Sequence, residues 1–438
     1  MTKVLRILNN VRLAFFPIAY ALSGVLIGST LNRIMIADLG YSATVVAIFF
    51  AIPLMVSPVR VWIGYRSDGF LILGKRREPY IILGALVIGM GILAISNIIT
   101  RSDFSGLMAA AIALAFLLYG LGRNLAHNTF QALVADRYEG AARSRAATFY
   151  EVATMFGMVM GAGLIKKSLA NYEPATLVAV ALGVAAAVLV LASFGVVGQE
   201  EKSLASQASK KAREVSFGEA FRNMVMADPQ VRLFFFIVTL TFVGTLAQDV
   251  LLEPFGALVL AMPVGETTGL TQYWGIGVLL AMLVSGLFLL KWLGWIKTMR
   301  AGMLLSVVAF LGPIAAGMLV NISLLKAAVF VMGLGTGLAG AGMLSGTLSF
   351  TSRLRAGMLL GVWAVANMAG HAFGSVTGGL IVDSVRALSG SAFAAYASVF
   401  GLEALLLLAA FNLSLRLRVD ASRAVEEEHA QLEFATAD

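Results

Sequence analysis

Two carboxylates four residues apart, Asp249 and Glu253, lie inside a strongly apolar segment that reads from Gln248 to Gly256. In an α-helix this spacing places both acids about 6 Å apart along one face. A charged carboxylate at the centre of a bilayer costs about 2.5–3.5 kcal/mol on insertion scales unless a partner compensates it. The pair therefore requires a role, either as a capped acidic helix end or as part of a binding site or a gate.

Pro254 directly follows Glu253 and affects the helix that carries both acids. Proline has no amide donor and disfavours the helical conformation of the preceding residue, so we expect a break in the helix here. Counting from Val231 at about 1.5 Å per residue places Asp249 about 27 Å along, near the outer edge of a hydrocarbon core about 30 Å thick. At that depth both acids could be hydrated, or Asp249 could pair with Arg33, which we also expect on the outer side.

Further titratable residues fall in apolar stretches. His127 and His371 are lone histidines, and such residues commonly hydrogen-bond to a neighbouring helix. Arg123 and Glu151 lie in consecutive apolar stretches, so they could form a neutralising pair that locks the bundle or takes part in proton coupling. Glu403 is a further acid at membrane depth.

The composition indicates a membrane protein. Hydrophobic residues make up 59% of the chain and charged residues 13%, whereas about a quarter of the residues in soluble domains are charged. The absence of cysteine excludes disulfides, thiolate metal sites and a cysteine nucleophile. A net charge of +8 would suggest a nucleic-acid partner in a soluble chain, but here the basic residues act as orientation signals, and we expect no nucleic acid.

Apolar stretches long enough to cross a bilayer predict twelve transmembrane helices. They lie roughly at 12–35, 42–62, 80–100, 106–127, 146–166, 175–197, 231–257, 271–291, 299–320, 323–346, 357–382 and 390–414. If both termini face the cytoplasm, the Lys and Arg residues left on the outer side are Arg33, Arg101, Lys166, Lys167, Lys326 and Arg386. The remaining basic residues lie inside, as the positive-inside rule requires.

The longest polar segment divides the chain into two six-helix halves. We expect an N-terminal bundle at 1–197, a cytoplasmic linker at 198–230, a C-terminal bundle at 231–414 and a cytoplasmic tail at 415–438. Within the linker, a capping box formed by Ser216 and Glu219 predicts a helix lying at the inner membrane surface. Basic segments before the fifth and eleventh helices echo each other, which indicates a duplicated unit typical of major facilitator transporters.

Several stretches, read together, resemble the PucC/LhaA family of major-facilitator-like proteins from phototrophic bacteria. They are Leu31 to Ile36, Pro58 to Arg60, Gly64 to Asp68, Arg77 to Tyr80, Gln248 to Gly256 and Thr267 to Thr271. The similarity is specific over 1–80 and 230–290 and is mainly topological elsewhere. Between 120 and 129 the glycine spacing is kept while the polar residues differ, so the subfamily and the antenna complex served stay open.

The resemblance implies an assembly factor that binds bacteriochlorophyll and delivers it to light-harvesting antenna polypeptides in the bacterial inner membrane, cytoplasmic or intracytoplasmic. Chlorophyll magnesium takes an axial ligand, which a neutral imidazole, an amide or a water can supply. The candidate pigment-binding residues are then His127, His371, Gln248, Asp249 and Glu253. We expect no metal site beyond this ligation, and nothing in the sequence supports a carotenoid site.

A second group of residues suits gating or coupling, namely Arg33, Asp68, Arg123 and Glu151. Asp68 lies in a loop that resembles the major facilitator motif between helices 2 and 3. There the acid associates with a helix end and basic partners in a conformation-dependent way. The alternative for Asp68 is a solvated loop acid beside Arg66.

Nothing in the chain provides a nucleophile with its base, a metal cluster or a nucleotide-binding loop, so we expect no enzyme activity. Two alternatives to pigment delivery stay open. One is a proton-coupled secondary transporter of a small amphiphilic solute. The other is a pigment-free structural partner of antenna polypeptides or pigment-synthesis enzymes, with membrane lipid as the common surroundings.

Overall fold

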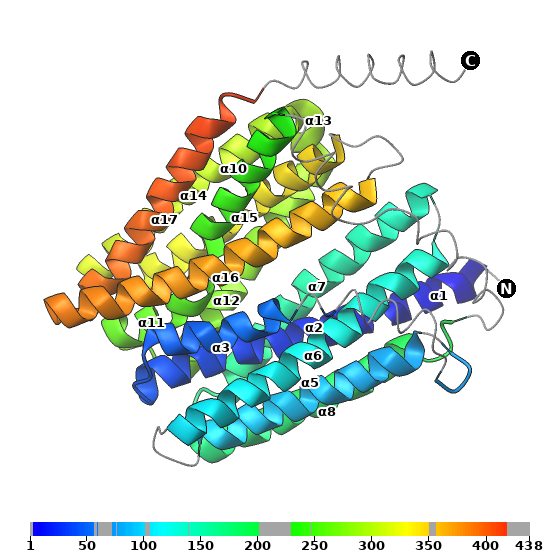
Figure 1. The fold of residues 1–438 in the computed structure, drawn as a ribbon, viewed down its shortest axis with the longest axis horizontal. Helices are drawn as coiled ribbons and strands as arrows, with labels where there is room; N and C mark the ends of the chain where they lie inside the picture. Colours follow the sequence, from blue (N-terminus) through cyan, green and yellow to red (C-terminus); the bar gives the residue numbers. More distant parts are fainter. Residues whose placement is uncertain are drawn as a thin grey trace.

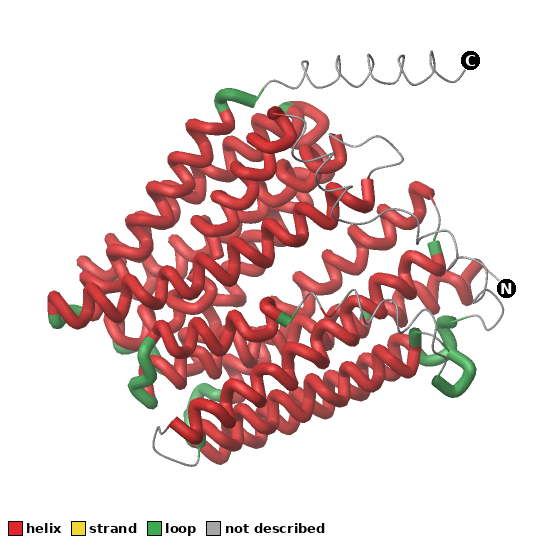
Figure 2. Tube along the Cα trace, viewed as in Figure 1, coloured by secondary structure: helices red, strands yellow, loops and turns green. Residues whose placement is uncertain are grey.

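The computed structural model describes residues 3–56, 59, 72–75, 77–100, 106–138, 140–200, 229–246, 248–349 and 356–417. Within these residues the chain is helical, no strand occurs, and short loops connect the helices (Figure 2). The expected all-α class is therefore confirmed. The interfacial helix predicted within 198–230 and the tail beyond residue 417 lie outside the described residues.

The helices form two groups that follow the order of the chain (Figure 1). The first group contains α1 (Lys3–Leu13), α2 (Phe15–Val25), η1 (Leu26–Leu31), η2 (Ile34–Asp38), α3 (Ala43–Met55), α5 (Glu78–Ile99), α6 (Gly106–Arg137), α7 (Gly140–Ser168) and α8 (Pro174–Val196). The second contains α10 (Pro229–Leu246), α11 (Gln248–Leu260), α12 (Val264–Val284), η4 (Ser285–Leu289), α13 (Leu290–Trp292), α14 (Gly294–Met318), α15 (Ile322–Ser349), α16 (Ala356–Ser389) and α17 (Ala392–Ser414).

These two groups, here called the first and second halves, approach each other at one end and diverge toward the other (Figure 1). The halves touch mainly where α12 packs on α7 and α16 packs on α3. We call the end where α3 begins and α16 ends the closed end, and the opposite end the open end. This arrangement places residues from both halves around the centre of the molecule.

Every apolar stretch predicted from the sequence falls on a described helix. Nine helices of the described chain are long and apolar enough to cross a membrane. The predicted spans at 42–62, 146–166 and 357–382 correspond to α3, α7 and α16, which are not among the nine. In α3 only a short part, Ala43–Met55, is described, and α7 carries Glu151 and two lysines. The count of twelve spans therefore stays a prediction.

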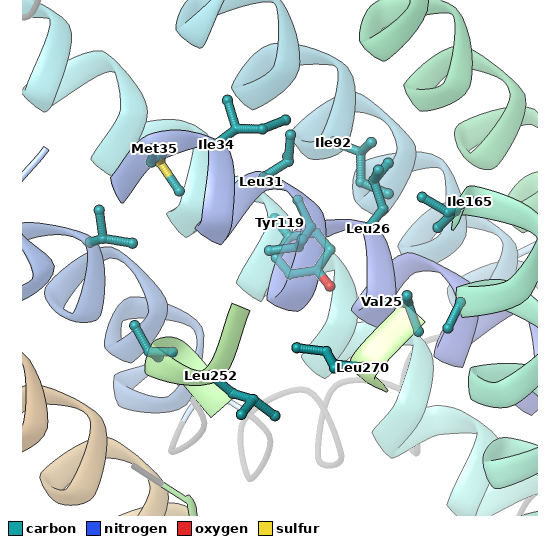
Figure 3. Close-up of a cluster of buried hydrophobic side chains, with 14 of the residues drawn as sticks. Val25, Leu26, Leu31, Ile34, Met35, Ile92, Tyr119, Ile165, Leu252 and Leu270 are labelled. Carbon is teal, nitrogen blue, oxygen red and sulfur yellow. The ribbon is translucent and has the colours of Figure 1, made fainter. Parts of the chain in front are cut away.

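Apolar side chains and close helix contacts hold each half together. The helical segments α2, η1 and η2 follow one another without a break from Phe15 to Asp38, and this stretch is here called the first helix. Leu26 and Leu31 of the first helix and Ile92 of α5 are fully buried, and Figure 3 shows them within one cluster. Glycines allow helix backbones to approach closely. A Cβ atom on Gly302 of α14 would lie 2.2 Å from the backbone nitrogen of Ala339 in α15. Without a hydrophobic driving force between helices in lipid, such close packing is a main source of cohesion.

Pro254 does not break its helix, which corrects the expectation from the sequence. α11 continues through Pro254 to Leu260, so Glu253 lies inside this helix, whereas Asp249 lies in its first turn. Proline cannot donate to the carbonyl of Val250 four residues earlier. The side chain of Asn32, from the first helix, donates to that carbonyl at 2.8 Å instead. A buried amide from the other half thus replaces the missing donor and joins the two halves.

A carboxylate from the second half caps a helix of the first half at the closed end. Asp383 of α16 accepts hydrogen bonds from the backbone N–H groups of Ala43 at 3.0 Å and Thr44 at 2.8 Å. The Thr44 hydroxyl donates to the same carboxylate at 2.5 Å. Negative charge at a helix N-terminus is stabilising because the first N–H groups have no partner within the helix.

An ion-pair bridge also crosses the closed end. Glu266 at the start of α12 contacts Lys166 of α7 at 3.1 Å and Lys326 of α15 at 2.5 Å. Each side chain is about a third exposed or less, and exposed pairs of this kind contribute only about 0–1 kcal/mol. The bridge therefore contributes little to the free energy of folding and mainly fixes how α7, α12 and α15 lie relative to one another.

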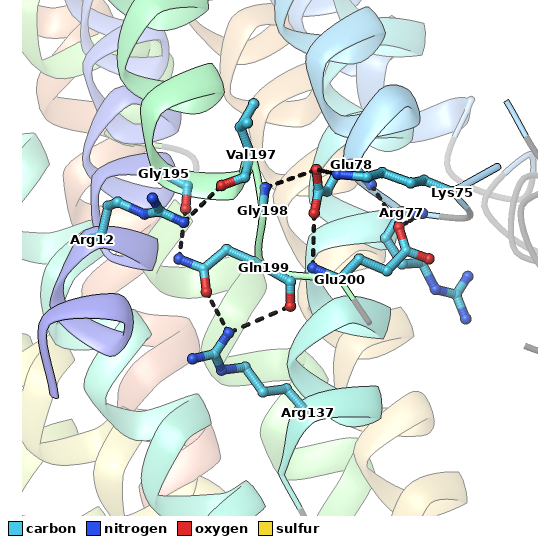
Figure 4. Close-up of polar contacts among 10 residues, drawn as sticks. All are labelled: Arg12, Lys75, Arg77, Glu78, Arg137, Gly195, Val197, Gly198, Gln199 and Glu200. Atoms are coloured by element: carbon cyan, nitrogen blue, oxygen red, sulfur yellow. Dashed lines mark hydrogen bonds and ion pairs between the residues drawn. The ribbon is translucent and has the colours of Figure 1, made fainter. Parts of the chain in front are cut away.

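At the open end, the residues that follow α8 are hydrogen-bonded to the start of α5 (Figure 4). The Glu78 carboxylate accepts from the backbone N–H groups of Gly198 at 3.0 Å and Glu200 at 2.7 Å. The Glu200 carboxylate in turn accepts from the N–H of Arg77 at 2.9 Å, just before α5. The first residues of the predicted linker are thereby anchored to the first half.

Candidate functional site

A cavity of about 350 Å³ lies between the two halves. Its wall contains residues of the first helix, α3, α6 and α7 on one side and of α11, α12 and α16 on the other. The volume falls at the lower end of the range of about 300–1,000 Å³ found for small-molecule sites. The titratable residues that line it are Arg123, Asp249, Glu253 and His371, together with Tyr20 and Tyr119.

Asp249 and His371 meet on the wall formed by the second half. His371 Nε2 lies 3.4 Å from Asp249 Oδ2, and the two side chains are 29% and 35% exposed. When one imidazole nitrogen donates to a carboxylate, the ring is oriented and the other nitrogen is left as an acceptor or metal ligand. The structure thus brings together two residues that the sequence separates widely.

Glu253 is more deeply buried than Asp249 and connects three helices. Its side chain is 4% exposed, and Oε1 accepts a hydrogen bond from the Thr271 hydroxyl at 2.8 Å. The same hydroxyl is hydrogen-bonded to Ser29 of the first helix. The two acids therefore face the centre of the molecule and are not hydrated at its outer edge, because α11 extends well beyond them.

The sequence stretches that carried the family resemblance pack against one another here. Thr30 of the first helix and Thr268 of α12 share a buried hydrogen bond of 3.0 Å. Asn32 bonds to α11 as described above. The sequence analysis did not predict this contact; small polar residues within apolar stretches are its signal in the sequence, but they do not indicate which helices meet.

Gln248 and Glu403 form a second buried polar contact beside the cavity. The backbone N–H of Gln248 donates to Glu403 Oε1 at 2.9 Å, and each residue is 1% exposed. Within the described chain, Gln248 Oε1, Glu253 Oε2 and Glu403 Oε2 are buried without a hydrogen-bond partner. Buried acceptors usually have a hydrogen-bond donor as partner. A protonated carboxyl group at Glu253 or Glu403 would itself be such a donor.

Arg123 forms the polar part of the opposite wall. Its Nη1 donates to the Tyr119 hydroxyl at 2.8 Å, and the guanidinium lies 3.9 Å from the centre of the Tyr20 ring. The pairing with Glu151, which the sequence left open, is not formed, because the contacts found for Arg123 in the described chain are with tyrosines. Arg123 faces the tyrosines and the cavity, whereas the Glu151 side chain is exposed.

The two candidate histidines have different positions. His127 stacks on the Tyr20 ring with centroids 4.8 Å apart and an angle of 29° between the planes. It is not among the residues that line the cavity, whereas His371 is. The two histidines were equal candidates from the sequence, but only His371 lines the cavity in the described chain.

Arg33 does not pair with Asp249, so the gate that was one of the alternatives from the sequence is not formed by this pair. Its guanidinium contacts Asp38, and it donates to the carbonyl of Met262 at 3.3 Å. The chain forms a π-helical turn at Ile34–Asp38, in which residues five apart lie over one another. This local geometry supplies Arg33 with a nearer acid. Asp68, the remaining gate candidate, lies outside the described residues.

Comparison with known proteins finds similarity over most of the chain. The family model described as PUCC protein matches residues 30–421. Protein PucC of Rhodobacter capsulatus is 31% identical over 423 residues, which cover 91% of this chain and 90% of that protein. A protein named bacteriochlorophyll synthase 44.5 kDa chain, from the same species, is 29% identical over 88% of this chain and 90% of its own length.

Solved structures of transporters share the fold. A bacterial homologue of the human lysosomal transporter Spinster, in an inward-facing and unoccupied conformation, matches with a TM-score of 0.72 and 14% identity over 97% of this chain and 98% of that chain. The nucleoside transporter NupG matches with a TM-score of 0.71 and 13% identity over 93% and 98%. The fold is thus of the major facilitator type, and the chain is a multi-pass integral membrane protein.

Proposed function

Because this chain belongs to the PucC family, we propose that it binds bacteriochlorophyll in its central cavity and delivers the pigment to light-harvesting antenna polypeptides. The name of one relative, a chain of bacteriochlorophyll synthase, supports a link with pigment. The membrane would be the bacterial inner membrane, with both termini and the open end on the cytoplasmic side. The chain itself would carry out no catalysis.

The observation that carries this proposal is the contact between His371 and Asp249 at the cavity wall. The magnesium of a chlorophyll accepts one axial ligand, and a neutral imidazole is a suitable one. A metal-binding histidine usually donates its second ring N–H to a carboxylate or carbonyl, which fixes its orientation. His371 would therefore hold the pigment and Asp249 would orient His371.

The size of the cavity limits how the pigment would be held. A volume of about 350 Å³ suits part of a tetrapyrrole ring, not a whole pigment with its hydrocarbon tail. The rest of the molecule would then lie beyond the cavity, toward the end where the halves diverge. That position would let the pigment leave toward a membrane partner.

Substitution of the two histidines tests the proposal. The full chain would be purified from a phototrophic host, and the bacteriochlorophyll absorbance per protein measured for wild type, His371→Leu and His127→Leu. We expect a fixed pigment content in wild type and in His127→Leu, and loss of about 90% or more in His371→Leu, since removing even a partner that orients a metal ligand costs about 10–100-fold in affinity. Equal pigment content in all three proteins would contradict the assignment of His371.

Proton-coupled transport is a second candidate, and the buried acids favour it. Glu253 and Glu403 each have a carboxylate oxygen without a hydrogen-bond partner in the described chain, as expected for groups that carry a proton. In proteoliposomes, an imposed proton gradient should then accelerate uptake of a fluorescent tetrapyrrole without a tail. Glu403→Gln should remove the acceleration. Antenna polypeptides that co-purify with a colourless, transport-inactive protein would instead favour the structural role.

A further inference from the structure

Arg123 is a positive charge in the cavity wall that forms no ion pair within the described chain. Of the described lining residues, it alone is permanently cationic. Among the described arginines, Arg33 and Arg77 pair with a carboxylate, whereas Arg123 contacts tyrosines. A charged residue at membrane depth usually marks a substrate or ion pathway, because its burial is otherwise unfavourable. The position of Arg123 therefore points to a ligand that offers a hydrogen-bond acceptor.

The neighbours of Arg123 hold its guanidinium in place without using all of its donors. Tyr119 accepts one hydrogen bond from Nη1 at 2.8 Å. Tyr20 presents its ring face at 3.9 Å, and His127 stacks on the same ring. An aromatic face stabilises a cation but accepts no full hydrogen bond from each N–H group. The guanidinium has five N–H donors, so donors remain for a ligand.

The backbone near Arg123 leaves room for its guanidinium. Gly24 of the first helix also lines the cavity, and a Cβ atom there would lie 3.0 Å from Arg123 Nη1. Any larger residue at this position would press on the guanidinium. The glycine thus keeps the end of the arginine side chain uncovered on the side of the first helix.

Most other hydrogen-bond donors of the cavity wall are used within the protein or buried. The Thr154 hydroxyl donates to a backbone carbonyl of its own helix at 3.0 Å, and the Asn124 amide donates to a carbonyl of α3 at 3.1 Å. The Thr271 hydroxyl donates to an acid of α11. Trp274 Nε1 has no hydrogen-bond partner in the described chain, but this nitrogen is buried within the wall. Arg123 is thus the charged donor that this wall offers to a ligand.

Arg123 and the proposed axial ligand line the same cavity from different halves. Arg123 lies on α6 of the first half, and His371 lies on α16 of the second half. A tetrapyrrole extends outward from its metal, so a pigment held by His371 would bring groups on its ring edge to other parts of the wall. Bacteriochlorophyll carries two carbonyl groups conjugated with its ring, an acetyl group and a ring keto group, and both are present in the esterified pigment. A carbonyl oxygen is a hydrogen-bond acceptor, and a charged donor forms the stronger kind of hydrogen bond.

We propose that the Arg123 guanidinium donates a hydrogen bond to a carbonyl oxygen conjugated with the bacteriochlorophyll ring, and so selects this pigment over tetrapyrroles that lack that carbonyl. This inference rests on the proposed function and adds a specificity-determining residue to it. It assigns the magnesium to His371 and the carbonyl to Arg123. A neutral pigment leaves the charge balance of the cavity to Arg123 and the acids of α11, so no ionised group of the ligand is required.

Pigments that differ in a single carbonyl group provide the first test. The purified full-length chain in lipid nanodiscs would be titrated with bacteriochlorophyll, with an analogue that has a vinyl group in place of the acetyl group, and with one that has a methylene group in place of the ring keto group. We expect wild type to bind one analogue about tenfold or more weakly than bacteriochlorophyll, the loss expected for one hydrogen bond to a charged group. That analogue identifies the carbonyl. Arg123→Met should bind all three pigments with similar affinity.

The carbonyl vibration gives a readout that a merely structural role of Arg123 would not move. A carbonyl that accepts a hydrogen bond vibrates at lower frequency, and resonance Raman spectra of the bound pigment report the two conjugated carbonyls separately. We expect one carbonyl band of wild type at lower frequency than in bacteriochlorophyll dissolved with imidazole in an aprotic solvent, where only the axial ligand is supplied. The band should return to the solvent position in Arg123→Met. Arg123→Lys, which keeps a charged donor, should retain part of the shift.

A matched control removes an arginine outside the cavity. Arg300 of α14 contacts Ser414 and does not line the cavity, so Arg300→Gln should behave as wild type in both measurements. Equal affinity of wild type for the three pigments, or a carbonyl band that is the same in wild type and Arg123→Met, would overturn the inference and leave the proposed function standing. Failure of wild type to bind any of the three would overturn the two together. If Arg123→Met does not fold, the pigment preference and the carbonyl bands of wild type and Arg123→Lys decide.

Discussion

Replacing Asp383 with alanine should loosen the closed end of the molecule. This carboxylate, at the end of α16, caps α3 and is the acid that joins the second half to a helix N-terminus of the first half. A state in which the closed end separates would lose these bonds, whereas a state with the end closed keeps them. The substitution therefore acts on the balance between the two states as well as on stability.

The size of the effect follows from the hydrogen bonds that are lost. Asp383 accepts bonds from Ala43 N, Thr44 N and Thr44 Oγ1. A hydrogen bond to a charged group contributes about 1.5–3 kcal/mol, and loss of a helix cap costs about 0.5–2 kcal/mol. Because the site is only partly buried and water can replace some of these bonds, we expect about 2 kcal/mol in total, or about a 30-fold shift toward the separated state.

A distance measurement across the closed end gives the assay. The chain contains no cysteine, so Asn171→Cys in the first half and Leu388→Cys in the second can be spin-labelled without background. Both positions are exposed near the closed end. We expect one short distance in the labelled wild type and an added, longer population in Asp383→Ala.

Glu173→Gln is the matched control, since Glu173 is an exposed acid at the same end whose side chain caps no helix. It should leave the distance distribution unchanged. If Asp383→Ala gives the wild-type distribution, or if Glu173→Gln produces the same shift, the cap does not hold the closed end together and the reasoning fails.

Two further pairs of substitutions test the packing. Asn32→Ala should lower the free energy of unfolding by about 1–3 kcal/mol, because the buried carbonyl of Val250 is left without a donor. The loss should be smaller in a Pro254→Ala background, where the helix again supplies an N–H to this carbonyl. Equal losses in the two backgrounds would contradict this coupling. Gly302→Ala should destabilise by about 1–3 kcal/mol because its Cβ would meet Ala339 at 2.2 Å. Gly286→Ala, where nothing lies within 4 Å, should be neutral or slightly stabilising, and similar melting temperatures for the two glycine variants would argue against the close packing.

The helices could be predicted from the sequence because their signal is local. Runs of apolar residues predicted spans at 175–197 and 390–414, and the structure contains α8 (Pro174–Val196) and α17 (Ala392–Ser414) there. The family could also be predicted, because the motifs that identify it are short contiguous stretches of the sequence. Such patterns depend on composition and spacing within a few helical turns.

The contacts of the candidate site depend on how distant helices meet, which spacing does not encode. His371 reaches Asp249 from another helix, and Glu403 reaches Gln248 across 155 positions in the sequence. Arg33 was assigned the wrong acid because a π-helical turn brings Asp38 under it, and ordinary helical spacing does not predict this turn. The helix break predicted at Pro254 does not occur, and Asn32, which is distant in the sequence, donates to the carbonyl that the proline leaves without a partner.

Pigment delivery by this chain can be measured as transfer from the purified protein to antenna polypeptides. The purified chain, loaded with bacteriochlorophyll, would be mixed in nanodiscs with affinity-tagged antenna polypeptides that carry no pigment, and the near-infrared absorbance of the separated antenna fraction would be followed with time. Pigment should move to the antenna polypeptides, and the His371→Leu protein, which cannot be loaded, should transfer none. Pigment that binds but never leaves for the antenna, or a wild-type protein that cannot be loaded, would contradict pigment delivery.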